Sequence, residues 1–176
     1  MEINLISKSD ARLISDYYLK NSCHFKEWEP TRESDYHSIS AWEQRIAAII
    51  QEQEKGLSSR FLMYDDLNTE IIGVCSLTNI VRGPFQACNI GYSISECHQG
   101  KGLMKYLCRH VISHAFEELN LNRVMANYMP RNIRSGKLLQ SLGFTVEGEA
   151  RKYLKINGRW EDHVLTSIVS TEHKYN

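Results

Sequence analysis

Residues 88–128 contain the feature that most restricts the fold: an apolar strand, a glycine-containing loop, an amphipathic helix and a second strand. A strand, a helix and a strand in succession form a crossover, which places the two strands parallel. The loop, 99–104, reads Gln-Gly-Lys-Gly-Leu-Met. Its glycines allow a sharp turn and the close approach of a ligand. Because the free N–H groups and the dipole of the following helix favour phosphate there, we predict a pyrophosphate-binding loop.

The glycine loop alone does not identify a ligand. Its spacing differs from that of a P-loop and from the G-x-G-x-x-G of dinucleotide-binding folds. The first strand also has no acidic residue that could bind a ribose. A structural turn between a strand and a helix is as compatible with this loop as a ligand site, so its function depends on the rest of the chain.

The remaining segments predict a mixed sheet with helices. Capping residues and apolar periodicity predict a strand at 2–6, a helix from a capping box at 7–10 to about 21, a polar loop, and a helix from a capping box at 40–43 to about 56. Antiparallel strands are predicted at 60–65, 70–81 and 88–94, joined by turn residues. A strand at 123–128 and a helix at 132–142 follow, and the chain ends in a hairpin of 149–156 with 160–169. The predicted fold class is α+β: a mixed, mainly antiparallel sheet with one parallel pair.

The balanced charge of the chain limits its expected partners. Lys plus Arg and Asp plus Glu both number 21 in 176 residues. We therefore expect neither nucleic acid nor an anionic membrane to bind over a broad face. The sequence has no recognisable signal peptide and no apolar stretch long enough to cross a bilayer. We expect a cytoplasmic protein with a single domain over 1–176.

The five cysteines are odd in number and contain no C-x-x-C pair. We predict that they are small buried apolar side chains. The alternatives are a metal site that includes Cys97 and His98, or a catalytic thiol. Neither has a second ligand or a base at a characteristic spacing, so we expect no metal.

Two spaced motifs resemble the paired signature of the GNAT acetyltransferases. The first, Gln-x-x-Gly-x-(Gly/Ala), is matched by Gln99 and Gly102, whereas Met104 replaces the usual small residue. The second, Asn-x-x-Ser-x-x-Leu-(x)₄-Gly-Phe, is matched by Asn132, Ser135, Leu138, Gly143 and Phe144. Over nearly its whole length the chain resembles the RimJ/RimL type, the ribosomal-protein N-terminal acetyltransferases. It resembles the RimJ branch most, in segments 28–30, 81–83, 90–94, 125–130 and 153–163.

The resemblance implies the GNAT fold, with acetyl-CoA bound where the parallel strands splay apart. The pantetheine arm is expected along Ile94 and Ser95, with the oxyanion contact at or near the N–H of Ile94. Asn132 and Ser135 are expected near the pantetheine end and the thiol. The pyrophosphate is expected on the backbone amides of Gln99, Gly100, Lys101, Gly102, Leu103 and Met104.

The implied reaction is direct attack by a neutral amine on the thioester in a ternary complex. The expected acceptor is the N-terminus of a protein or peptide, possibly the N-terminal alanine of a ribosomal protein. The expected assembly is a monomer or a homodimer. Three rival functions stay open: a GNAT enzyme acting on a small amine such as a polyamine or an antibiotic, a non-catalytic acetyl-CoA sensor, and an interaction domain with an inert loop.

The catalytic acid is not found at the position that many relatives use, because Leu139 stands where they have a tyrosine. Ser135 matches the serine proposed as the acid in the RimL branch and is our candidate. It could equally bond the backbone at the start of a helix. Tyr128 could orient the substrate or simply pack in its strand.

The catalytic base is also open, since Asn89 and Leu154 stand at two positions where relatives have glutamate. The remaining carboxylates are Glu29, Glu149 and Asp162. Each could instead be an ordinary surface acid, and a base acting through water is equally compatible.

Overall fold

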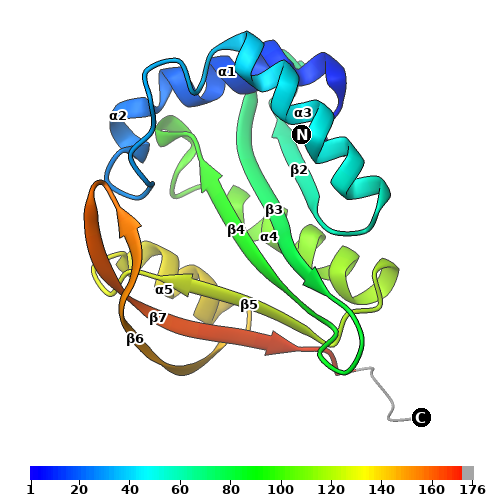
Figure 1. The fold of residues 1–176 in the computed structure, drawn as a ribbon, viewed down its shortest axis with the longest axis vertical. Helices are drawn as coiled ribbons and strands as arrows, with labels where there is room; N and C mark the ends of the chain where they lie inside the picture. Colours follow the sequence, from blue (N-terminus) through cyan, green and yellow to red (C-terminus); the bar gives the residue numbers. More distant parts are fainter. Residues whose placement is uncertain (172–176) are drawn as a thin grey trace.

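A single sheet of seven strands organises the computed structural model, which describes residues 1–171 (Figure 1). The strand order is β1-β2-β3-β4-β5-β7-β6, and every neighbouring pair is antiparallel except β4 and β5. The predicted α+β class with one parallel pair is confirmed. The strands are β1 (Ile3–Leu5), β2 (Ser59–Tyr64), β3 (Ile71–Val81), β4 (Ala87–Ile94), β5 (Arg123–Tyr128), β6 (Thr145–Ile156) and β7 (Arg159–Val169).

Helices cover both faces of the sheet. In Figure 1, α1 (Ala11–Lys20) and α3 (Ile39–Glu54) lie over the upper part of the near face, and the short α2 (Ser22–Phe25) follows α1. On the far face lie α4 (Leu103–Ser113) and α5 (Ile133–Ser141). The shorter helices are η1 (Lys8–Asp10), η2 (Glu96–His98) and the π-helix η3 (His114–Glu118). None of the helices in the described part of the chain is long and apolar enough to cross a membrane.

Each face of the sheet has its own core, because successive strand residues point to opposite sides. Leu62 and Val74 pack with α1 and α3 on the near face. Met63 and Leu77 pack with α4 on the far face, where the predicted apolar stripe of the helix is buried. The lower near face, below α1 and α3, has no helix over it (Figure 1).

The start of α3 differs from the prediction by two residues. The cap is Ser38, whose hydroxyl accepts a hydrogen bond from Ala41 N at 3.3 Å, and Ser40 already lies within the first turn. Ser38 has the extended backbone that a cap requires, with φ −63° and ψ 155°. The capping box at the start of the first helix is confirmed, since Asp10 accepts from Ser7 N at 2.7 Å.

The prediction for the cysteines is right for three and wrong for two. Cys75, Cys88 and Cys108 are buried, but Cys23 and Cys97 are exposed. The exposed pair lies in the short helices α2 and η2, which have no apolar periodicity to indicate burial. Among the described residues, no three His, Cys, Asp or Glu side chains come together as metal ligands.

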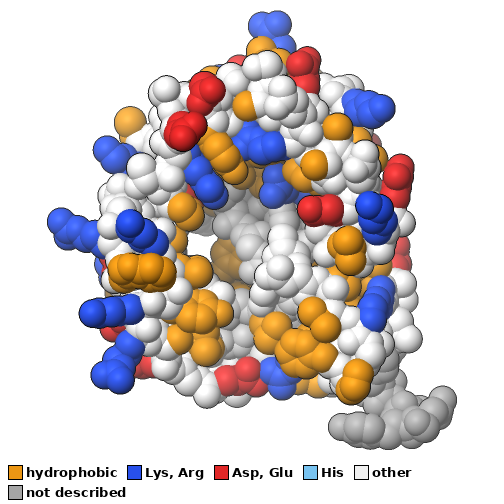
Figure 2. Space-filling view, in the orientation of Figure 1, with side chains coloured by type: hydrophobic (Ala, Val, Ile, Leu, Met, Phe, Trp, Pro, Cys, Tyr) orange, Lys and Arg blue, Asp and Glu red, His pale blue; other side chains and the backbone are white. Residues whose placement is uncertain are grey.

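The parallel strands separate after only three paired positions. Ala87, Cys88 and Asn89 of β4 pair with 123–125 of β5, and the pairing then stops. Beyond that point β4 stays with β3, and β5 stays with β7 up to Tyr128. The strands therefore diverge from a common end (Figure 1), and Figure 2 shows a hollow near the middle of this face.

Candidate active site

The loop that leads into α4 has the conformation that its glycines predict. Gly100 and Gly102 have φ of 73° and 77°, and Gly102 is the N-cap of α4. An added Cβ at either position would meet no atom within 4 Å. Glycine is thus required by backbone angle and not by lack of space. The turn presents the first N–H groups of α4 at the end of β4.

The side chain of Gln99 connects this loop to two other elements. Its Nε2 lies 2.6 Å from His24 Nε2 on α2, and its Oε1 accepts from Arg134 on α5. His24 and Arg134 are not part of the two sequence motifs, so the sequence analysis missed both contacts. Arg134 also adds a cation beside the loop that already contains Lys101, which favours an anionic ligand there.

The hydrogen bonds between β3 and β4 determine which amides face the space between β4 and β5. Ser95 N donates to Ile72 O at 2.9 Å, so the N–H of Ser95 points toward β3. Ile94 is opposite Gly73 in the adjacent position of the antiparallel ladder. Bonded and non-bonded pairs alternate, so the N–H and C=O of Ile94 point away from β3 and into the splay. Of the two residues expected along pantetheine, Ile94 alone directs its N–H there.

A tyrosine and a serine bridge the two sides of the splay. Tyr92 Oη on β4 lies 2.8 Å from Ser135 Oγ on α5. Asn132 Oδ1 accepts from Ser135 N at 3.1 Å and thereby caps α5. Burial raises the pKa of Tyr92, so its hydroxyl is protonated at neutral pH. The sequence analysis missed Tyr92, whose signal was only a polar hydroxyl on an apolar strand ending at a glycine loop.

Tyr128 lies against α5 because residue 136 is glycine. An added Cβ at Gly136 would approach the Tyr128 ring to 2.9 Å, too close for an ordinary contact. The ring is half-buried at the end of β5. Tyr128 and Ser135 therefore lie near the same first turn of α5.

The three candidate carboxylates have different surroundings. Glu29 is half-buried, and burial raises its pKa against the opposing effect of Arg32 and Arg60. Glu149 is exposed on β6 opposite Val164. The third, Asp162, accepts a hydrogen bond from Lys152 N at 2.7 Å, where β6 bulges.

The loop that carries Glu29 is held beside the open near face. Asn157 N, in the turn of the β6–β7 hairpin, donates to Glu29 O at 2.9 Å. Tyr17 and Tyr18 of α1 also lie close enough for the charge of Glu29 to affect their pKa. Tyr17 Oη in turn lies 2.9 Å from Ser93 Oγ on β4. Glu29 thus lies on the side of α1, on the face opposite to α4 and α5.

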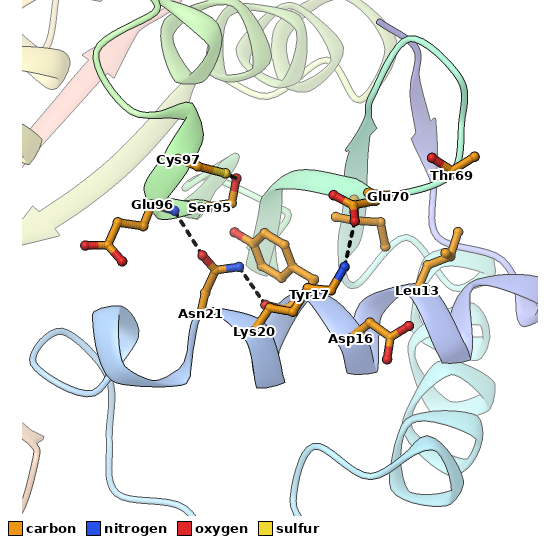
Figure 3. A pocket seen from close by; sticks show the side chains of 11 residues that line it. Leu13, Asp16, Tyr17, Lys20, Asn21, Thr69, Glu70, Ser95, Glu96 and Cys97 are labelled. Carbon is orange, nitrogen blue, oxygen red and sulfur yellow. Dashed lines mark hydrogen bonds and ion pairs between the residues drawn. The ribbon is translucent and has the colours of Figure 1, made fainter.

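A separate cavity of about 390 Å³ lies between α1 and the loops that flank β3 and β4 (Figure 3). Lys20 pairs with Glu70 at 2.6 Å across it. Asn21 accepts from Glu96 N at 2.9 Å and so holds α1 against the residues that follow β4. This cavity is on the α1 side of β4, and Ser95, Glu96 and Cys97 before the glycine loop line it.

Comparisons with known proteins identify the family of the chain. The family model described as an acetyltransferase (GNAT) domain matches residues 2–145. The chain is 42% identical over 170 residues to the [ribosomal protein uS5]-alanine N-acetyltransferase of Escherichia coli K12, with 97% of this chain and 88% of that protein covered.

Two solved structures have the same fold. The ribosomal-protein-S5-alanine acetyltransferase of Vibrio fischeri superposes with a TM-score of 0.95 at 42% identity, over 98% of this chain and 94% of that one. Mycobacterium smegmatis RimJ, in complex with CoA-disulfide, superposes with a TM-score of 0.90 at 26% identity, over 99% and 84%.

Proposed function

This chain belongs to the GNAT acetyltransferases and is an N-acetyltransferase of the RimJ type, and we propose that its acceptor is the N-terminal alanine of ribosomal protein uS5. The proposal of this acceptor rests on the sequence identity to the E. coli enzyme across nearly the whole chain. The reaction moves the acetyl group of acetyl-CoA to the α-amine. A ribosomal acceptor supports activity in the cytoplasm.

The cofactor side of the proposed site uses mostly backbone groups. The amides of 99–104 hold the pyrophosphate, and the cations Lys101 and Arg134 add to its attraction. Asn132 orders the start of α5 beside the pantetheine arm. The N–H of Ile94 stabilises the oxyanion that develops as the amine attacks the thioester carbonyl.

The amine loses a proton during the transfer, and Glu29 is the proposed base. An α-amine has a pKa of about 8, so part of it is neutral at pH 7. A carboxylate whose pKa is raised by burial accepts a proton more readily than an ordinary surface acid. Glu149 and Asp162 are the rival bases. Glu149 is exposed, and Asp162 already accepts a hydrogen bond from Lys152 N, so we favour Glu29.

The leaving thiolate takes a proton, and Ser135 is the proposed donor. Its hydroxyl is hydrogen-bonded to Tyr92, which can replace the proton that Ser135 gives up and then regains its own proton from solvent as the products leave. Tyr128, which lies against the same turn of α5, is proposed to orient the acceptor.

The proposed acceptor is tested with a peptide that carries the N-terminal sequence of uS5 from the same organism, beginning with a free alanine. Release of CoA is followed for this peptide, for the same peptide with a blocked N-terminus, and for spermidine. Turnover that is lost on blocking supports the proposal. Turnover on spermidine alone would reassign the enzyme to small amines, and acetyl-CoA binding without any turnover would favour a sensor.

A further inference from the structure

Three arginines gather on the near face, around the rings of Tyr36 and Trp42. Arg32 Cζ lies 4.5 Å from the centre of the Tyr36 ring. Arg45 Cζ lies 4.0 Å from the Tyr36 ring and 3.8 Å from the Trp42 ring. Arg60 Cζ lies 5.8 Å from the Trp42 ring. The aromatic faces thus hold three guanidinium groups close together.

No carboxylate among residues 1–171 lies within ion-pair distance of these three guanidiniums. Arg45 donates to backbone oxygens of 36 and 41, and Arg60 donates to Ser76 Oγ at 3.0 Å. In the described structure Nη1 of Arg45 is buried without a hydrogen-bond partner. Arg32 and Arg60 oppose the raised pKa of Glu29, so its carboxylate lies near these two cations but forms no ion pair with them.

The neighbouring His37 adds no positive charge at neutral pH. Burial, followed by Arg45 and Arg32, lowers its pKa to about 4. The ring is stacked on Tyr18 at 4.5 Å between centroids. The positive potential at this place therefore comes from the arginines.

The arginines lie on the same face of the sheet as Glu29, the proposed base. Arg60 is in register with Ser76, which is in register with Gly91 of β4, on the face opposite to α4 and α5. Figure 2 shows Lys and Arg side chains along the upper edge of the hollow on this face.

We infer that Arg32 and Arg60 bind an acidic side chain that follows the reactive N-terminus of the acceptor, an inference that rests on the proposed function. The guanidinium of Arg45 stacks on the rings of Tyr36 and Trp42 and holds them in position beside the other two arginines. A planar guanidinium matches the geometry of a carboxylate. An RNA backbone fits less well, because the chain has no net charge and phosphate binding of useful strength takes several cationic contacts.

The test uses peptides with a free N-terminal alanine and an otherwise neutral sequence, with one Glu or one Lys placed in turn at positions two to six. We expect Glu at one or two of these positions to raise kcat/KM about tenfold, as one charge-assisted hydrogen bond does. In Arg32→Gln and Arg60→Gln, the ratio of kcat/KM for the Glu peptide to kcat/KM for the neutral peptide is expected to fall toward one. Arg32→Glu is expected to favour the Lys peptides.

Arg109→Gln is the matched control, because Arg109 is exposed on α4 on the opposite face, and it should keep the preference for Glu. Binding of fluorescent Glu and neutral peptides to the CoA-loaded enzyme measures the same ratio if the peptides are not turned over. Failure of all free peptides to react would contradict the proposed function alone. Equal binding of the two peptides would overturn the inference. Inhibition by single-stranded RNA that Arg32→Gln removes would assign the arginines to RNA.

Discussion

The two sides of β4 are proposed to bind in different ways. On the far side, the predicted cofactor contacts are backbone amides of the glycine loop and of Ile94, shaped by positive φ at Gly100 and Gly102. On the near side, the proposed acceptor contacts are side chains, among them Glu29, Arg32 and Arg60. A fixed cofactor can be held by groups that every residue has, whereas a particular acceptor requires particular side chains. Changes to the glycine loop should therefore alter cofactor affinity, and changes to Glu29, Arg32 and Arg60 should alter turnover.

The largest expected effect is on the near side, from Glu29→Gln. Loss of the proposed base should lower kcat/KM for an N-terminal alanine peptide about a hundredfold. The affinity for acetyl-CoA should stay the same in isothermal titration calorimetry. Glu33→Gln, an exposed acid in the same loop, is the matched control.

The pH profile sharpens the test of Glu29. A base must be ionised, so kcat/KM of the wild type should fall as the pH drops through the raised pKa of Glu29. Protonation of the amine lowers the rate in the same direction, from a pKa of about 8. The pH profile of Glu29→Gln should lack the fall at lower pH, which belongs to Glu29, and should keep the fall that belongs to the amine. A variant that keeps both limbs and full activity would move the base to Glu149, Asp162 or water.

On the far side, Gly102→Ala should weaken acetyl-CoA binding about tenfold, because a non-glycine residue with φ of 77° costs about 1–2 kcal/mol. The loop relaxes to relieve the strain and its amides lose their alignment. Gly91→Ala is the control, since its φ is outside the left-handed region and an added Cβ meets no atom within 4 Å. Equal affinities for acetyl-CoA in calorimetry would show that the loop amides are not the binding groups.

A smaller effect is expected on the far side, at the hydrogen bond between Tyr92 and Ser135. Tyr92→Phe should lower kcat about tenfold, the low end of acid catalysis, with little change in acetyl-CoA affinity. Because the pKa of Tyr92 is raised, the wild type should show no loss of this proton donor up to the ordinary tyrosine pKa. Ser135→Ala should add little to Tyr92→Phe if both act in one relay. Additive losses would separate their roles.

The smallest expected effect comes from Gly136→Ala. Alanine favours a helix over glycine by about 1 kcal/mol, but here the new Cβ displaces the Tyr128 ring. Urea unfolding should therefore show no gain in the wild-type background and a gain of about 1 kcal/mol in Tyr128→Ala. Turnover of the single variant should fall a few-fold, about 1 kcal/mol of transition-state positioning. A gain in both backgrounds would show that the ring moves freely.

The contrast between local backbone features and side chains from distant segments also explains what the sequence could predict. The strands, the parallel pair, the glycine loop and the Asn132 cap depend on local patterns, and the structure has them. The cap of α3 was misplaced because two serines two residues apart both resemble N-caps. Contacts between distant segments could not be predicted: Tyr92 and Ser135 are 43 residues apart.

The acceptor side was least predictable for the same reason. Arg32 comes from a loop, Arg45 from α3 and Arg60 from β2, and only the fold brings them to Tyr36 and Trp42. The exposure of Cys23 and Cys97 depends on short helices without a periodic pattern. Glu29, Glu149, Tyr128 and Ser135 stay predictions as catalytic residues.

The early end of pairing between β4 and β5 has a consequence for the lifetime of the protein. Past Asn89 the backbone of β4 faces a gap that acetyl-CoA is expected to fill, so the ligand acts as a missing strand. A ligand that binds only the folded chain stabilises it by about 2.7 kcal/mol at a concentration one hundred times Kd. Amides of Tyr92 and Ile94 should then exchange hydrogen slowly only when acetyl-CoA is present. Proteolysis of this enzyme in the cell should accordingly slow when acetyl-CoA is abundant and quicken when it is scarce.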